Sequence, residues 1–426
     1  MNPDAIGDAT GVAMPSSVDS MRLVPAEFLT RAMHAYGTLP ADNRVLSIER
    51  LEVFPGGNSG QKALLDVTYA ADAGGLPRNL FAKFSRDFAD PFRDRRRAEL
   101  DGEVRLATLA RLPGFPVAVP RPVFADFEAS SGTGLLITER IAFGTGNVEP
   151  LHEKCMDHLL PDPLPYYRAL VSAQARLAAA QHRGALSPQL ESLFPYDRAT
   201  AEADLPISYG AAELAAKVAA LGSFIASHPQ LFPALVSDPS FTHRLADDAM
   251  SFLAREEAVR RFLQADPRFV AVCHWNTNID NAWFWREPDG TLNCGLLDWG
   301  MVRPMNIATG IWGGLSAAGT AFLERELGGL LDHYRAELAG HGGPALPADL
   351  LDLHFDLSLA LTGLALMMDL PALLLGRMPD IGAAKGALDP LLRRDKVVEG
   401  FLLVATNFLN LWARRDFGAS LQRIPR

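Results

Sequence analysis

The sequence predicts an α+β fold of two lobes, a small β-rich N-terminal lobe and a large, mainly helical C-terminal lobe. Two observations carry this prediction. Between residues 45 and 141, apolar residues alternate or form short runs bounded by turn residues, which is typical of strands. Beyond Gly144 the apolar spacing becomes helical, notably over 166–184 and 247–264, and one hairpin-like stretch at 273–300 interrupts it.

Length and charge limit the classes of partner. The chain has 426 residues, enough for two lobes that each bury a core. It carries 50 acidic and 40 basic residues, and the net charge of -10 disfavours nucleic acid as a partner. Its three cysteines, Cys155, Cys273 and Cys294, have no zinc spacing and do not make a disulfide framework. We therefore expect a reducing, cytoplasmic setting.

No segment predicts targeting or a membrane span. Residues 1–17 contain two aspartates, no Lys or Arg and no apolar block, so we expect a flexible leader rather than a signal peptide. The most apolar stretch, 357–376, is broken by Asp369 and Pro371, which favours a buried helix. We assign residues 1–40 to the leader and a first helix, 41–143 to the N-lobe and 144–426 to the C-lobe.

The small lobe is predicted to be an antiparallel sheet with one inserted helix. We expect strands over 45–54, 62–70, 79–85, 119–129 and 133–141, each bounded by turn residues. A highly charged helix is expected over 90–114, and its four arginines, Arg93, Arg95, Arg96 and Arg97, are most simply interpreted as solvated.

The turn PGGNSGQ between the first two strands could bring backbone amides to phosphate groups. Gly56, Gly57 and Gly60 allow close backbone approach, and Asn58 and Ser59 add donors. A plain hairpin turn is the alternative.

Lys83 lies in an apolar strand, where a lysine must either reach solvent or pair with an anion. Glu99 and Glu103 are four residues apart on the next predicted helix, so both lie on one face and either could pair with it. An edge-strand lysine beside a solvated helix is the alternative.

The stretch from 271 to 302 places polar residues at strand ends. Asn281 and Asp298 close or follow apolar runs, and the turn REPDGT between them predicts a hairpin. That hairpin would set an amide oxygen beside a carboxylate, which suits a hard cation such as Mg²⁺. The alternative is two ordinary turn residues.

The order of these motifs resembles the protein-kinase-like fold, and especially the aminoglycoside phosphotransferase and choline kinase family. Its catalytic loop reads H-G-D-x-x-x-x-N, followed by a hairpin and an I-D-F/W segment; here HWNTNIDN and LLDWG correspond. The resemblance spans roughly residues 45 to 340. It implies ATP and Mg²⁺ as cofactors and a small-molecule hydroxyl as acceptor. The implied nucleotide contacts are Gly56, Gly57, Asn58, Ser59, Gly60, Lys83, Glu103, Glu139 and Ile141; the implied metal ligands are Asn281 and Asp298, and the implied catalytic residues are His274 and Asn276.

Two departures from the family pattern bear on activity. The family's G-D is Trp275-Asn276, so an amide stands where a carboxylate should accept the hydroxyl proton. The acid expected about ten residues after the metal motif, which props the catalytic loop, is absent from MVRPMNIATGIWGG. Trp275 packs in the core or narrows the acceptor site.

A missing base does not by itself abolish phosphoryl transfer. General-base assistance contributes about 10²- to 10⁴-fold, while positioning and metal electrostatics carry most of the rate. The sequence thus predicts a slow phosphotransferase. The alternative is a catalytically inactive, pseudokinase-like protein that binds a nucleotide or small ligand and has a regulatory role.

Overall fold

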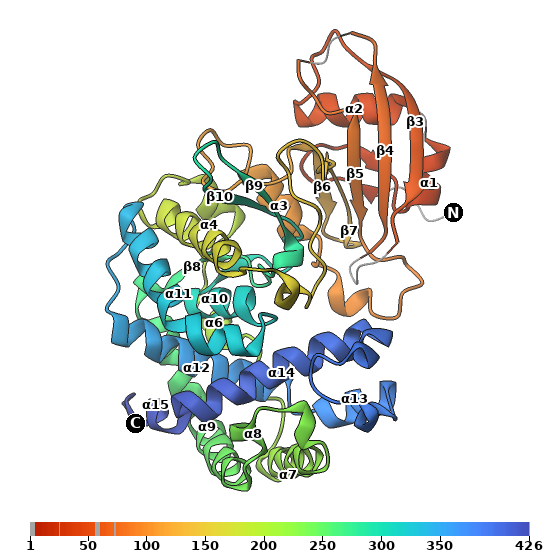
Figure 1. The fold of residues 1–426 in the computed structure, drawn as a ribbon. Helices are drawn as coiled ribbons and strands as arrows, with labels where there is room; N and C mark the ends of the chain where they lie inside the picture. The colour runs from red at the N-terminus through yellow and green to blue at the C-terminus, as the bar shows by residue number, and fades with distance from the viewer. Residues whose placement is uncertain (1–4, 25, 56–59, 72–73, 426) are drawn as a thin grey trace.

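The computed structural model describes residues 5–24, 26–55, 60–71 and 74–425. It has a small lobe built on one sheet and a larger, mostly helical lobe, as predicted (Figure 1). The sheet contains β3 (Val45–Val53), β4 (Lys62–Tyr69), β5 (Asn79–Phe84), β6 (Pro122–Glu128) and β7 (Thr133–Glu139). All neighbouring strands are antiparallel, in the order β3-β4-β5-β7-β6.

Two helices, α2 (Ala26–Tyr36) and α3 (Asp101–Leu109), cover opposite faces of this sheet. On one face, Phe124 of β6 lies opposite Ile137 in register and meets Phe28 of α2, with 6.2 Å between the ring centroids. Lys83 of β5 lies opposite Leu136, the neighbour of Ile137, and therefore points to the other face. That face carries α3, which comes between β5 and β6 in the chain.

The N-terminal segment is packed onto the small lobe, so the expectation of a flexible leader over 1–17 is wrong for residues 5–17, which the structure describes. Here β1 (Ala5–Ile6) pairs with β2 (Ala13–Met14), and α1 (Val18–Leu23) follows. The Asp126 carboxylate accepts hydrogen bonds from the amides of Ala9 and Thr10, at 3.1 and 2.8 Å. Met14 and Met21 are fully buried in the small-lobe core, which fixes the segment by apolar burial as well.

The predicted helix over 90–114 is shorter than expected. Only α3 is α-helical, and a 3₁₀ turn, η1 (Asp94–Arg96), precedes it. Arg93 is buried rather than solvated, because its guanidinium donates to the Arg86 carbonyl, to the Ser131 carbonyl at 2.9 Å and to the Thr133 hydroxyl at 2.9 Å. A local charge pattern could not show these acceptors, which come from a distant turn and strand.

The large lobe is helical around a small group of strands. Its helices are α4 (Leu164–His182), α5 (Gln189–Leu193), α6 (Arg198–Glu202), α7 (Ala211–Ser227), α8 (Ala234–Ser237), α9 (Pro239–Ala265), α10 (Ile307–Leu315), α11 (Thr320–Gly340), α12 (Ala348–Leu366), α13 (Leu370–Arg377), α14 (Lys396–Arg415) and α15 (Phe417–Gln422). Short 3₁₀ turns are η2 (Asp157–Leu159), η3 (Pro229–Leu231), η4 (Pro267–Phe269), η5 (Ile279–Asn281), η6 (Ile381–Ala383) and η7 (Pro390–Arg394). Its core includes Trp412 of α14, which is fully buried.

The strands of the large lobe carry the loop that the sequence singled out. β8 (Val270–Cys273) pairs with β11 (Arg303–Asn306), and β9 (Ala282–Arg286) pairs with β10 (Leu292–Leu296) as the predicted hairpin. Cys273 and Cys294 are buried core residues, as expected.

The apolar stretch 357–376 forms the end of α12 and all of α13 except its last residue, Arg377. α12 is largely buried within the lobe, as predicted. In the described parts of the chain no single helix is long and apolar enough to cross a membrane; α12 and α13 together would be, but they bend by 50° at the break between them.

Candidate active site

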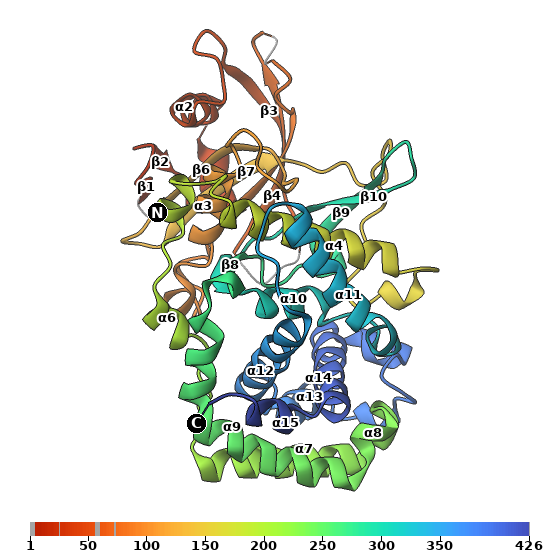
Figure 2. The same cartoon turned by 90° about the vertical axis from the view of Figure 1, so that its left-hand side faces the viewer.

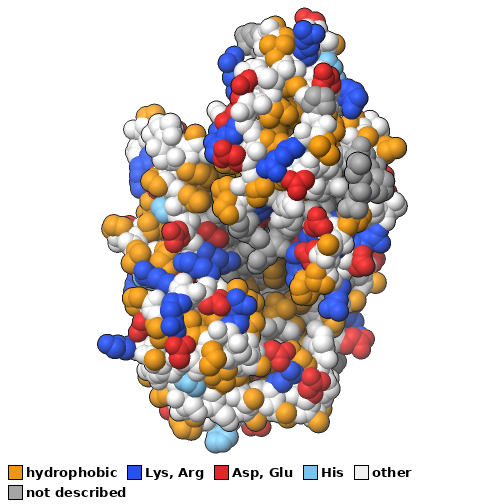
Figure 3. All heavy atoms as spheres, turned by 90° about the vertical axis from the view of Figure 1, so that its right-hand side faces the viewer, with side chains coloured by type: hydrophobic (Ala, Val, Ile, Leu, Met, Phe, Trp, Pro, Cys, Tyr) orange, Lys and Arg blue, Asp and Glu red, His pale blue; other side chains and the backbone are white. Residues whose placement is uncertain are grey.

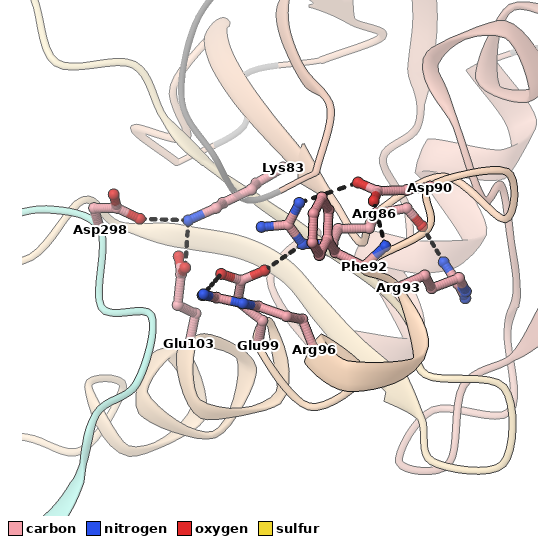
Figure 4. A network of polar contacts seen from close by, with 9 residues as sticks. All are labelled: Lys83, Arg86, Asp90, Phe92, Arg93, Arg96, Glu99, Glu103 and Asp298. Carbon is pink, nitrogen blue, oxygen red and sulfur yellow. Dashed lines mark hydrogen bonds and ion pairs between the residues drawn. The ribbon is translucent and has the colours of Figure 1, made fainter. Parts of the chain in front are cut away.

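Lys83 joins the two lobes through two carboxylates (Figure 4). Its ammonium group is ion-paired with Glu103 of α3 on one side and lies 2.5 Å from Oδ1 of Asp298 on the other. Glu99, the second candidate partner, instead pairs with Arg86 at 2.8 Å. Figure 3 shows one face of the molecule, hollowed at middle height between its upper and lower parts, with acidic and basic side chains on both sides of the hollow.

The electrostatics of this cluster favour the charged forms of Lys83 and Asp298. Burial opposes the charge on Lys83, which is 4% exposed, but Glu103 and Asp298 outweigh it and raise the lysine pKa. Burial likewise opposes ionisation of Asp298, yet the Lys83 ammonium lowers the pKa of that carboxyl to about 2. Burial raises the pKa of Glu103, and the Lys83 ammonium offsets that rise only in part. One side of Asp298 stays open, since its side chain is 40% exposed.

A second cation, which the sequence reasoning missed, faces the same site. Lys62 begins β4 directly opposite Lys83 in the β4–β5 register. Burial lowers the pKa of Lys62 and the neighbouring Lys83 lowers it further, while Asp298 and Glu103 raise it. An incoming anionic group would relieve the repulsion between the two ammonium groups. A lysine at the first position of a strand has no distinctive pattern, so only the strand register reveals it.

The glycine turn lies between β3 and β4. Gly56, Gly57, Asn58 and Ser59 lie outside the described residues. Gly60 has φ +66°, and a Cβ atom there would come within 1.9 Å of the Phe84 carbonyl oxygen. Only glycine fits this close approach, which sets the base of the turn against the end of the Lys83 strand.

The loop after β8 is built on His274. The imidazole is 1% exposed; its Nε2 donates to the Leu297 carbonyl at 2.8 Å, and its Nδ1 accepts from the Asn276 amide at 3.1 Å. Burial lowers the pKa of His274 to about 4, so it is neutral at physiological pH. It thus ties the loop to the strand end next to Asp298 and positions the two.

Asn276 and Asn281 are held by the same loop. The Asn276 side-chain oxygen accepts a hydrogen bond from the side-chain amide of Asn278 at 2.5 Å. The Asn281 side-chain amide donates to the Asn276 carbonyl at 2.8 Å, which leaves the Asn281 side-chain oxygen as the atom that can ligate a cation. The Asn281 carbonyl also accepts from the Leu297 amide at 2.8 Å, so Asn281 lies beside the segment that carries Asp298.

These two residues suit a hard cation. Both offer oxygen atoms, and Asp298 is ionised and partly exposed. Asp298 also has φ +54°, an unusual backbone conformation for a residue other than glycine, and such strain is common at functional sites. Among the described residues no group of three or more His, Cys, Asp and Glu side chains is placed to hold a metal. Two protein ligands therefore fit Mg²⁺ only with water or phosphate oxygens beside them.

A glycine and a glutamine support the loop, where the family pattern would place an acidic residue. A Cβ atom on Gly313 of α10 would come within 1.7 Å of the Trp275 carbonyl oxygen, so the helix backbone itself supports the loop. Gln174 of α4 donates to the Thr277 hydroxyl at 2.5 Å inside the core. In the sequence, the only signal for the role of Gln174 is that a polar residue lies within an alanine-rich helix.

One carboxylate oxygen of the loop residue Asp280 has no hydrogen-bond partner among the described residues. The Oδ1 atom of Asp280 is buried and, within the described part of the chain, accepts no hydrogen bond. Burial raises the pKa of Asp280, the nearby Lys154 lowers it, and Asp298 adds to the rise.

Glu139 and Ile141 follow the last strand of the small lobe. The Glu139 carboxylate accepts from the Arg121 amide at 2.9 Å, so it holds the β6–β7 edge together, and Ile141 is half-buried where the chain passes to the large lobe. No described contact ties either residue to the Lys83 cluster.

The sheet order, the strand lysine paired with a helix glutamate and the hairpin that ends at Asp298 define a two-lobed, protein-kinase-like arrangement. No family model and no curated protein matches the sequence.

Among solved structures, the chain is similar to a Plasmodium vivax ethanolamine kinase, with a TM-score of 0.45 and 11% identity over 96% of this chain and 92% of that one. It is similar to a microcompartment-associated aminopropanol kinase, with a TM-score of 0.43 and 14% identity over 93% and 100% of the two chains. A third is a spectinomycin phosphotransferase solved with ADP and spectinomycin, with a TM-score of 0.39 and 12% identity over 89% and 94%. All three are kinases or phosphotransferases that the chain resembles in fold.

Proposed function

We propose that this protein is an ATP- and Mg²⁺-dependent phosphotransferase that acts on a hydroxyl group of a small molecule. The observation that carries the proposal is the Lys83 cluster: a buried strand lysine paired with Glu103 and within 2.5 Å of Asp298. In protein kinases, phosphoryl transfer requires a strand lysine paired with a helix glutamate, together with an aspartate and an asparagine that hold Mg²⁺.

Each group has a role that its chemistry supports. Lys83 and Lys62 bind phosphate oxygens, and the turn that ends at Gly60 provides backbone amides. Asn281 and Asp298 hold Mg²⁺, which neutralises charge on the transferred phosphoryl group when bound. His274 positions the loop rather than transferring a proton, because both of its nitrogens are engaged and it is buried.

Asn276 makes the proposed enzyme slow. Its side-chain oxygen accepts from Asn278 at 2.5 Å, and an amide does not take up the proton of an attacking hydroxyl. It can still orient that hydroxyl. A rate lower by about 10²- to 10⁴-fold than with a carboxylate follows. The three cysteines are buried and unpaired, which supports the cytoplasmic setting of the proposal.

A nucleotide-dependent thermal shift tests the binding step. We expect ATP with Mg²⁺ to raise the melting temperature of the full chain, and Asp298→Asn to remove the Mg²⁺-dependent part of the rise. Asp289→Asn is the matched control, because Asp289 is exposed in the β9–β10 turn of the same hairpin. A native chain that is not stabilised by ATP, ADP or GTP, with or without Mg²⁺, would overturn the proposal.

The second candidate is a protein that binds nucleotide and does not transfer phosphate, and Asn276 is the observation that favours it. Restoring the carboxylate with Asn276→Asp separates the two. For the enzyme we expect phosphate transfer, measured over a panel of small hydroxyl compounds or as ATP hydrolysis, to rise by about 10²-fold or more. Nucleotide binding without transfer in both forms would favour the regulatory protein.

A further inference from the structure

The two edges of the small-lobe sheet differ in how they are covered. At β6, the Asp8 amide of the N-terminal segment donates to the Phe127 carbonyl at 3.1 Å, and the Thr38 hydroxyl donates to the Val123 carbonyl at 2.6 Å. At the other edge, β3 pairs with β4 alone among the described strands. In Figure 1, β3 is the outermost strand at the right of the small lobe, and Figure 2 shows it with α2 at the top of the molecule. The edge of β3 is therefore open to another strand.

The backbone of β3 shows which residues would bind that strand. The Phe54 amide donates to the Lys62 carbonyl at 2.8 Å and so points toward β4. The register with β4 continues without a break from Val53 back to Arg50. Because backbone groups alternate in direction along an antiparallel strand, those of Leu51 and Val53 point away from β4. No backbone group of the described helices and loops hydrogen-bonds to them.

The charges beside Leu51 are complementary to themselves. Leu51 packs in part against the small-lobe core, and Arg50 and Glu52 lie on the opposite face of the strand. Their side chains are 38% and 61% exposed, and the Arg50 guanidinium lies 2.6 Å from the Glu52 carboxylate. If two copies pair as antiparallel strands about a two-fold axis at Leu51, Arg50 of each copy lies opposite Glu52 of the other. An axis at Arg50 or at Glu52 would instead set like charges directly opposite, which is destabilising. Backbone direction and charge thus select the same residue for the axis.

We propose that the β3 edge binds a second copy of this chain, antiparallel about a two-fold axis at Leu51, and joins the two small-lobe sheets into one. The Leu51 amide of each copy donates to the Leu51 carbonyl of the other, and the four charges of Arg50 and Glu52 alternate in sign across the seam. The occupant is a second copy because the order Arg-Leu-Glu is complementary to its own reverse. Pairing also covers part of Val53, which is 54% exposed. The proposal does not depend on nucleotide binding, because no residue of the seam belongs to the Lys83 cluster.

The seam is short, so the dimer is weak. The register of β3 shifts between Ile48 and Arg50, and an irregularity of this kind ends regular pairing. Nearer the start of the strand, the Val45 amide already donates to the Thr30 hydroxyl of α2 at 3.0 Å. We therefore expect a dissociation constant on the order of 10 µM.

Charge reversal tests the seam in the full chain. In sedimentation velocity up to a concentration on the order of 100 µM, we expect the native chain to pass from monomer to dimer. Arg50→Glu and Glu52→Arg should each weaken dimerisation by about tenfold or more, because each variant sets like charges opposite at both ends of the seam. An equimolar mixture of the two variants should form a heterodimer with about the native affinity, since the acidic pair of one chain then meets the basic pair of the other.

The mixture separates the contact between copies from the ion pair within each chain. Both variants break the pair of Arg50 with Glu52 in their own chain, and mixing does not restore it. Glu257→Arg, which reverses an exposed charge paired with Arg261 on α9, is the matched control and should dimerise as the native chain does. The proposal is overturned if the native chain stays monomeric, if neither charge reversal weakens its dimer, or if the mixture is no more dimeric than its two components. Stabilisation by ATP should be the same in all these variants, so failure here is distinct from failure of the phosphotransferase proposal.

Discussion

At the scale of single residues, Lys62 is the most informative addition to the site. It faces Lys83 across the β4–β5 register, and the repulsion between the two cations contributes to its lowered pKa. A ligand with phosphate groups would be bound by both lysines. Without a ligand, Lys62 opposes its neighbour and contributes little to stability.

Lys62→Gln therefore separates binding from stability. We expect ATP affinity to fall by about tenfold, the worth of one charge-assisted hydrogen bond, while the melting temperature without ligand stays the same or rises. Isothermal titration and thermal unfolding measure the two effects. Lys385→Gln, an exposed residue of the large lobe, should change neither. If Lys62→Gln lowered the melting temperature as well as the ATP affinity, Lys62 would instead stabilise the fold without ligand.

At the scale of secondary-structure elements, His354 connects α12 to β11 and α10, which follow the β9–β10 hairpin in the chain. Its ring stacks on Phe269 with 3.8 Å between centroids, and its Nδ1 lies 2.8 Å from the Asn306 side-chain nitrogen. The side-chain oxygen of Asn306 accepts from the Ala308 amide and so caps α10. Burial lowers the pKa of His354 to about 4, and the nearby Asp266 raises it only in part. The imidazole is therefore neutral and accepts from Asn306 at neutral pH.

This lowered pKa predicts a pH dependence of stability. The unfolded chain binds the proton near the ordinary value of 6.5, and the folded chain binds it only near 4, so the free energy of unfolding falls as pH drops from 6.5 to 4. The expected loss is about 3 kcal/mol. His354→Gln should remove that part of the slope in denaturant unfolding measured across this range. The exposed His243→Gln should leave the slope unchanged, and a His354→Gln slope equal to that of the native chain would contradict the assignment.

At the scale of the whole molecule, the Lys83 cluster connects the lobes. Lys83→Met would leave the Glu103 carboxylate buried without its cation, and we expect a loss of about 3–5 kcal/mol in the free energy of unfolding. The double variant Lys83→Met with Glu103→Leu should recover much of this loss, because position 103 then no longer carries a buried carboxylate without its cation. Arg22→Met, which breaks an exposed ion pair with Asp19, is the control and should cost less than about 0.5 kcal/mol in the same denaturant titration. If the losses in the free energy of unfolding caused by Lys83→Met and by Glu103→Leu simply added in the double variant, the expected coupling between Lys83 and Glu103 would be contradicted.

The sequence predicted the parts of the fold and site that local patterns and motif order encode. The two lobes, the β9–β10 hairpin and the pairing of Lys83 with a helix glutamate follow from strand alternation and residue order, and the family resemblance favours Glu103 as that glutamate. Arg93 and Gln174 were missed because their partners, the Ser131 carbonyl and the Thr277 hydroxyl, come from distant segments. The leader was misjudged because its few buried residues, such as Met14 and Met21, form no periodic pattern.

The contact between Lys83 and Asp298 has a consequence for how ligands compete. Asp298 belongs to the same chain, so it is present beside Lys83 at a high effective concentration. Its carboxylate therefore competes with any phosphate group for the Lys83 ammonium. A free phosphate must displace it, which lowers the apparent affinity. A cation that binds Asp298 and separates it from Lys83 removes this competition. A bound metal should therefore raise the affinity for phosphate, and bound phosphate should raise the affinity for the metal by the same factor.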